Sequence, residues 1–260
     1  MARERASRPN GASSGTPELT SWLDLVLAVP IVGVQVSPWM YTHHEYVSSL
    51  RPMLESWKPE PIKITANRPG AIILERTQSG FSHELSPDNI VTKFVQPIPI
   101  GEPTSPSDSE LYFEARVPVA RYSDLLHASL LDTSTLIDNL STSHPVAVRR
   151  IGIVGLVRIA PKRFPPGVAR LYDYLRAPWT STEHVNSMTL AEVHRGDGFR
   201  DRCHHSLDVQ AESPGAATFS LDWQRVFDEP VAVRGDRRTI WHAAADAIKY
   251  FEQFATRTIP

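Results

Sequence analysis

The stretch AVRRIGIVGLVRI at residues 147–159 decides the fold class of this chain. Branched apolar residues dominate it and no proline interrupts it, so it predicts a long β-strand. Gly152 and Gly155 lie inside the run, where glycine usually marks a bulge or a place at which another backbone comes close. We therefore expect a β-sheet in which this segment is the strongest strand.

The residues after 159 predict a helix, a set of antiparallel strands and a closing helix. Residues 168–175 carry apolar side chains at helical spacing. Residues 185–227 indicate an antiparallel meander, because Gly196-Asp197-Gly198 and Ser213-Pro214-Gly215 supply its turns. The closing helix should lie against the sheet of residues 147–227 through one apolar stripe, formed by Ile240, Ala244, Ala247, Ile248, Phe251 and Phe254.

The residues before 147 predict a comparable series of elements. Residues 31–36 alternate as a half-buried strand does. A helix should follow, because Thr42 and Glu45 fit a capping box, and Pro52 inside it predicts a kink or two short helices. The remaining expected elements are strands at 62–67, 71–77, 90–96 and 111–117, a long exposed loop at 97–109 and a helical region at 123–141.

The order of these elements repeats along the chain. We predict an α+β fold with an antiparallel sheet, helices packed on one face and two related β-α-β-β-β-α halves. One continuous sheet with helices on one face is the alternative. The expected organisation is a disordered tail at 1–18, a first α+β half at 19–118, a connecting helical region at 119–146 and a second half at 147–260.

Composition excludes several classes of protein. Of the 260 residues, 41% are hydrophobic and 22% are charged, which is typical of a globular domain. The net charge of -2 gives no clustered positive field, so we do not expect nucleic acid as a partner. The longest apolar stretch, residues 25–34, is too short to span a membrane. The single cysteine, Cys203, favours a cytoplasmic location.

Motifs for catalysis, cofactors and metals are missing. The sequence contains no nucleophile elbow and no phosphate-binding glycine loop, so we expect no cofactor. His204 and His205 should point to opposite faces of a strand, with Cys203 on the apolar face, so a metal site is not expected there. His43 and His44, at the start of a helix, diverge in the same way.

One polar surface is nevertheless a candidate site. Alternation places Arg150 and Arg158 on one face of their strand. The other candidate residues of this surface come from the meander at 185–227. They are His194 on its first strand and Arg200, Arg202 and His204 on its second strand. If these faces coincide, they form a basic strip that could hold a small anionic ligand or an acidic partner. The alternative is an ordinary solvated sheet face, which the pattern favours.

Three segments carry a resemblance to a known family. They are Val148 to Gly152 after a helix near Tyr122, the pair Leu221-Asp222, and the ending from Ile240 to Glu252. Together they resemble a sporadically distributed bacterial family of unknown function, similar in length to this chain. The apolar run after Gly152 departs from the family pattern. The resemblance implies a bacterial cytoplasmic accessory protein and supplies no catalytic residue.

Two functions remain open from the sequence. The first is a non-catalytic binding or assembly module with a protein partner or self-association, which the missing motifs favour. The second is an enzyme that acts on an anionic substrate through the His/Arg strip. An enzyme requires a concave pocket with a perturbed histidine, whereas an interaction protein exposes an apolar patch.

Overall fold

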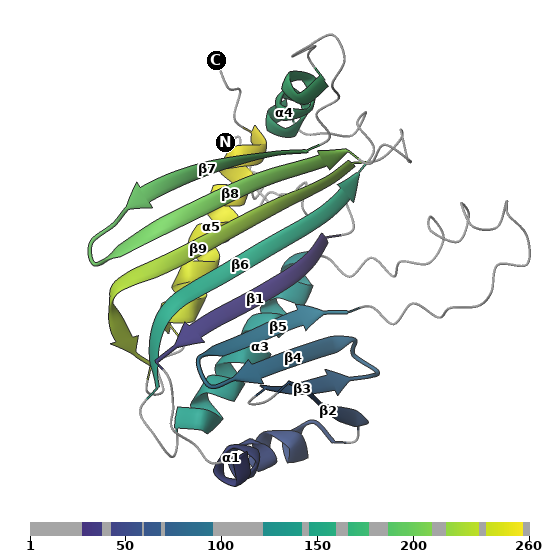
Figure 1. The fold of residues 1–260 in the computed structure, drawn as a ribbon, viewed down its shortest axis with the longest axis vertical. Coiled ribbons are helices and arrows are strands. Elements are labelled where there is room, and N and C mark those ends of the chain that lie inside the picture. Colours follow the sequence, from purple (N-terminus) through teal and green to yellow (C-terminus); the bar gives the residue numbers. More distant parts are fainter. Residues whose placement is uncertain are drawn as a thin grey trace, which may run out of the picture.

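The computed structural model describes residues 28–37, 43–58, 60–68, 71–95, 122–141, 146–159, 166–176, 187–209, 217–233 and 238–256. Within these residues the chain forms one nine-stranded antiparallel sheet and four helices, an α+β fold (Figure 1). The strands are β1 Ala28–Val36, β2 Ile62–Arg68, β3 Ala71–Arg76, β4 Phe81–Ser86, β5 Asn89–Phe94, β6 Ala147–Ile159, β7 Ser187–Arg195, β8 Phe199–Val209 and β9 Ala217–Ala232. The helices are α1 His43–Ser56, α3 Tyr122–Ser141, α4 Pro166–Arg176 and α5 Arg238–Thr256.

The sheet is continuous from the first strands to the last. Its order is β2-β3-β4-β5-β1-β6-β9-β8-β7, so strands from both parts of the chain meet where β1 pairs with β6. At this junction Gly33 lies opposite Gly152. The single sheet answers the question, left open by the sequence, of whether the chain builds one sheet or two.

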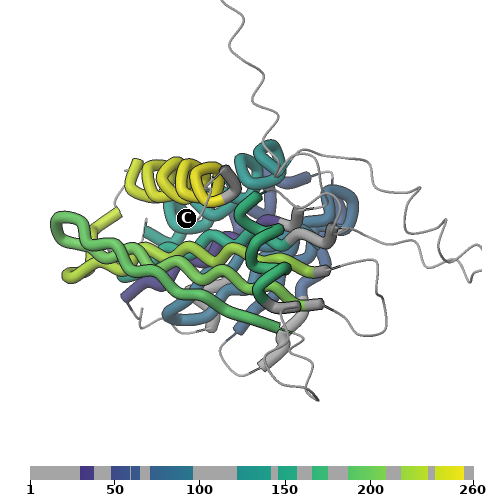
Figure 2. The backbone as a smooth tube through the Cα atoms, turned by 90° about the horizontal axis from the view of Figure 1, so that it is seen from above, coloured from purple at the N-terminus to yellow at the C-terminus, as the bar shows by residue number. Residues whose placement is uncertain are grey.

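One hydrophobic core joins buried residues of the strands with buried residues of the four helices. In β1 the side chains of Val32, Val34 and Val36 are buried, whereas Gly33 and Gln35 alternate with them toward the other face. Helix α3 contacts β1 and β5, and α5 contacts β6 and β9. Figure 2 shows α3 and α5 as neighbours beside the strands, in agreement with their mutual contact.

The strongest sequence signals predicted their elements correctly. The strand at 147–159 has the expected bounds, and the meander is β7, β8 and β9. The stripe of α5 is buried as expected, with Phe251 inaccessible to solvent and Lys249 exposed. Helix α1 is a single helix with Pro52 inside it.

The prediction missed one strand, β4. Its sequence, FSHELS, lacks a run of apolar residues, yet both Ser82 and His83 are buried. Buried polar side chains therefore hide the alternation on which the sequence argument relied. The expected tail at 1–18, loop at 97–109 and strand at 111–117 lie outside the described residues.

Candidate site on the polar face of the sheet

Four of the six candidate residues meet on the sheet face opposite the one that carries Val32 and Trp223, which we call the polar face. Three rows of register partners cross its centre. One runs Gly33, Gly152, Gln224, Arg202; the second Ile31, Val154, Asp222, His204; and the third Gln35, Arg150, Val226, Arg200. The rows place Arg150, Arg200, Arg202 and His204 on one surface, on strands β6 and β8.

Hydrogen bonds connect part of this surface. Arg150 Nη1 donates to Gln224 Oε1 at 3.4 Å, and Gln224 Nε2 donates to Asp222 Oδ2 at 2.8 Å. His204 Nδ1 lies 3.8 Å from the same carboxylate, which is too long for a hydrogen bond. Arg200 Nε lies 3.7 Å from Asp228 Oδ1. Gln224 therefore links Arg150 of β6 to Asp222 of β9, and His204 of β8 lies near this carboxylate without a hydrogen bond.

Three arginines of the polar face form what we call the arginine cluster: Arg150, Arg200 and Arg202. All three are exposed. Arg195, also exposed, is the register partner of Arg200 and extends the cluster onto β7. Arg195 is not among the candidates predicted from the sequence, although counting the register back from the Gly196 turn places it on this face.

His194 does not belong to this surface, contrary to the expectation that the polar faces coincide. Its register partner is Asp201, and its ring lies 5.7 Å from the ring of Tyr250 on α5. The turn between β7 and β8 pairs even-numbered residues of one strand with odd-numbered residues of the other. His194 therefore faces the helices, where Nε2 lies 3.2 Å from Glu192 Oε2.

Arg158 lies in β6 opposite Thr218, in the same alternating set as Arg150. The position of its side chain is outside the described part of the structure.

The two adjacent histidines of β8 diverge as expected. His204 is partly exposed on the polar face. His205 is buried against α5, where Nε2 lies 2.9 Å from Tyr250 Oη and the ring stacks on Phe254 at 4.0 Å. Among the described residues, no three His, Cys, Asp or Glu side chains are grouped so that they could hold a metal ion.

Cys203 lies on the apolar side of β8 and is buried, as expected. Its side chain faces the helices and is 1% exposed. Burial raises the pKa of its thiol to about 12, so the nucleophilic thiolate is scarce at neutral pH. This cysteine is therefore unsuited to covalent catalysis.

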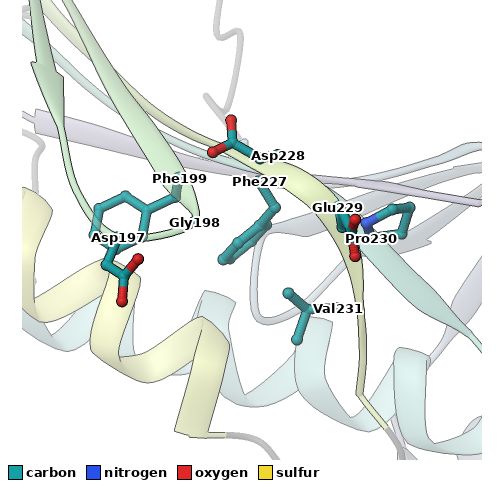
Figure 3. A pocket seen from close by; sticks show the side chains of 8 residues that line it. All are labelled: Asp197, Gly198, Phe199, Phe227, Asp228, Glu229, Pro230 and Val231. Carbon is teal, nitrogen blue, oxygen red and sulfur yellow. The ribbon is translucent and has the colours of Figure 1, made fainter.

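An open hollow lies at the β7–β8 turn and the bend of β9, where Phe199, Phe227 and Val231 point toward the helices (Figure 3). Its lining residues are Asp197, Gly198, Phe199, Phe227, Asp228, Glu229, Pro230 and Val231. The lining has three carboxylates and no histidine or cysteine. The hollow thus lacks the histidine that the enzyme hypothesis requires, and its carboxylates would repel an anionic substrate.

No model of a protein family matches the chain, and no curated protein matches it. No helix among the described residues has both the length and the apolar character needed to cross a membrane.

Proposed function

We propose that this chain is a non-catalytic binding protein whose polar face holds an extended acidic segment of a partner protein. The observation that carries the proposal is the exposed arginine cluster on two strands of one sheet face. Guanidinium groups bind carboxylates with two parallel hydrogen bonds and are less strongly hydrated than lysine, which suits them to this role.

The spacing of the cluster fits an extended polypeptide. Arg200 and Arg202 are two residues apart on β8 and therefore roughly 6.6 Å apart along it. Alternate side chains of an extended acidic peptide repeat at the same distance. Arg150 lies two strands away from Arg200, at roughly 9.6 Å, so the cluster can hold carboxylates along the strand direction and across it.

The glycine pair at the centre of the polar face supports a close-fitting partner. Glycine weakens the interior of a strand, yet neither Gly33 nor Gly152 has a positive φ. A Cβ atom built at Gly33 would meet nothing within 4 Å, and one at Gly152 only atoms at 3.8 Å or more. The fold itself therefore does not require glycine at these two positions. A partner backbone that lies across the junction would require it, because a larger side chain would block its close approach.

Side-chain chemistry disfavours nucleic acid on this face. Sheets that bind single-stranded RNA stack bases on exposed aromatic rings. The polar-face positions described in β1, β5, β6, β8 and β9 include no phenylalanine, tyrosine or tryptophan. An acidic polypeptide needs only the charges that the face presents.

We also infer that the chain consists of two related halves with their long helices on the same face of the sheet. Seven buried positions of α3 coincide with seven buried positions of α5 when Asp132 is set against Asp246. The matching pairs are Leu126/Ile240, Ser129/Ala243, Leu130/Ala244, Thr133/Ala247, Leu136/Tyr250, Ile137/Phe251 and Leu140/Phe254. Both aspartates also bind an arginine from the sheet, Arg76 and Arg225 respectively.

An enzyme acting on an anionic substrate is the weaker candidate. Its best support is the approach of His204 to Asp222, but the two side chains are 39% and 32% exposed. Side chains that are this exposed to solvent do not lie in an enclosed pocket, which is where a proton transfer would be favoured.

The test is a fluorescence-anisotropy titration with a labelled oligoglutamate peptide. We expect the wild-type protein to bind it, and to bind oligolysine and single-stranded oligothymidine at least about tenfold more weakly. Reversing the arginine cluster (Arg150→Glu, Arg200→Glu, Arg202→Glu) should abolish binding, whereas reversing Arg51 and Lys249, both exposed on helices, should not. Equal affinities for the two sets of variants would contradict the proposal.

A further inference from the structure

We propose that the edge strand β7 pairs antiparallel with β7 of a second copy of this chain. The dimer would join the two sheets into one, with the symmetry axis passing beside Val193. The inference rests on the edge itself and is independent of what binds the polar face.

Strand β7 is a long edge with apolar side chains exposed on both faces. It is the last strand of the sheet and has β8 as its partner within the described residues. Leu190 is 41% exposed on the face toward α5, and Val193 is 59% exposed on the polar face. Among the described residues no strand neighbours the outer side of β7, and a sheet edge with exposed apolar side chains is the kind that pairs with another strand.

The opposite edge of the sheet is protected, and β7 is not. Strand β2 has a register shift between Ala66 and Arg68, and its Lys63 is exposed. Irregular register and lysine are two devices that discourage edge pairing. Strand β7 pairs with β8 without a shift over its whole length and contains neither lysine nor proline.

Helix α4 limits which part of β7 is accessible. It contacts both β7 and β8, and Figure 1 shows it beside the end of the sheet at which β7 begins. Met188, near that end, packs against the core. The accessible part of the edge is therefore the segment from Leu190 to Arg195, whose middle is close to Val193.

Charge selects the register of the paired strands. Sheet continuity requires that residues facing each other project to the same side, so the axis passes beside a residue. An axis at Glu192 would oppose two carboxylates. An axis at Val193 sets this valine against its own copy and places Glu192 opposite His194 of the second copy, a favourable cross-strand pair when the imidazole is protonated. An antiparallel pair about a twofold axis also closes, which gives a dimer and not a fibre.

The first test is the oligomeric state by size exclusion with light scattering over a range of concentrations. We expect a concentration-dependent dimer. Val193→Lys sets two ammonium groups against each other and should weaken dimerisation at least about tenfold. Ile64→Lys, an equally exposed position on the other edge, should leave the dimer unchanged. A monomer at every concentration, or equal effects of the two variants, would overturn the proposal.

The second test fixes the register by disulfide cross-linking. Residues directly opposite in antiparallel strands have Cα atoms about 4.5–5.5 Å apart, within the range that a disulfide spans. Val193→Cys should therefore cross-link to its own copy under mild oxidation. Ala191→Cys should not, because two copies of residue 191 would lie about 13 Å apart. The native Cys203 is buried and serves as the background. Efficient cross-linking at 191 instead of 193 would refute this register.

Discussion

Gly33 of β1 and Gly152 of β6 are register partners at the junction of the nine-stranded sheet, on its polar face. Neither glycine is required by the backbone, since neither has a positive φ. On one side of the pair lie the polar residues Gln224 and Arg202, in the same row. The glycine pair thus leaves two adjacent positions of the polar face without side chains, in the same row as Arg202.

We predict that Gly33→Val separates stability from binding. Valine favours strands, and nothing lies within 4 Å of a Cβ atom at this position, so the free energy of unfolding should rise by about 0.5–1 kcal/mol or stay unchanged. The affinity for oligoglutamate should fall. Denaturant unfolding and anisotropy measure the two effects. A clear loss of stability would show that the glycine serves the fold.

A second prediction concerns Phe251 of α5, which is fully buried. Phe251→Ala should lower the free energy of unfolding by about 3–5 kcal/mol, because the cavity adds to the lost hydrophobic transfer. Lys249→Ala, on the exposed side of the same helix, should cost less than about 0.5 kcal/mol. Urea unfolding of both variants is the measurement. Equal small losses would contradict the packing of α5.

Arg225 joins two strands and a helix, and its removal should be costly. Its guanidinium donates to both carboxylate oxygens of Asp201 at 2.8 Å and to Asp246 of α5 at 3.0 Å. Hydrogen bonds and charges from these carboxylates keep its pKa raised despite burial. Arg225→Ala should cost about 3–5 kcal/mol, because the Asp201 carboxylate loses its partner. If the double variant Arg225→Ala, Asp201→Ala is no more stable than the single variant, this explanation is wrong.

His83 should make the fold sensitive to mild acid. Its ring is buried against Trp57, and burial, with a smaller contribution from nearby Arg76, lowers its pKa to about 3. The unfolded chain takes up a proton near pH 6.5, whereas the folded chain does not. Stability should therefore fall as the pH drops from about 6.5 toward 3, by at most about 1.4 kcal/mol per pH unit from this group.

The variant His83→Gln serves as the matched control for that slope, because its side chain does not titrate. Thermal midpoints of both proteins between pH 7 and 4 give the comparison. Burial raises the pKa of Asp132, whose Oδ2 lies 3.5 Å from His83 Nε2, and this carboxyl therefore opposes the histidine effect. Parallel curves for wild type and variant would show that His83 titrates normally.

Thiol chemistry offers a further check on the register of β8. Cys203 should react slowly with a thiol reagent in the native protein and rapidly in denaturant, because it is buried and its pKa is about 12. The reaction of the protein with an absorbing disulfide reagent measures both rates. Rapid labelling without denaturant would show that β8 presents Cys203 to solvent.

The sequence predicted those parts of the fold in which local pattern and burial agree. Strand β6 is rich in branched residues, and α5 has a single apolar stripe, so their bounds and buried faces could be stated beforehand. Strand β4 could not be predicted, because His83 and Ser82 are buried through contacts with residues distant in sequence. Thr92 of β5, for example, lies 3.1 Å from His83 Nδ1.

The candidate site was predictable only in part. Alternation within β8 correctly grouped Arg200, Arg202 and His204. The side chains of β7 that join this group depend on the number of residues in the turn between β7 and β8. With the observed turn, Arg195 lies on the polar face and His194 lies on the helix side. A one-residue change in such a turn moves every side chain of the strand to the other face.

The most direct test of the account locates the bound acidic segment on the polar face. Gln35→Cys places an environment-sensitive dye next to the register partner Arg150, and Lys249→Cys places the same dye on the exposed side of α5. We predict that saturating oligoglutamate changes the emission of the dye at position 35 and leaves that at position 249 unchanged. An unchanged signal at 35, or an equal change at both positions, would contradict the assignment of the polar face as the binding surface.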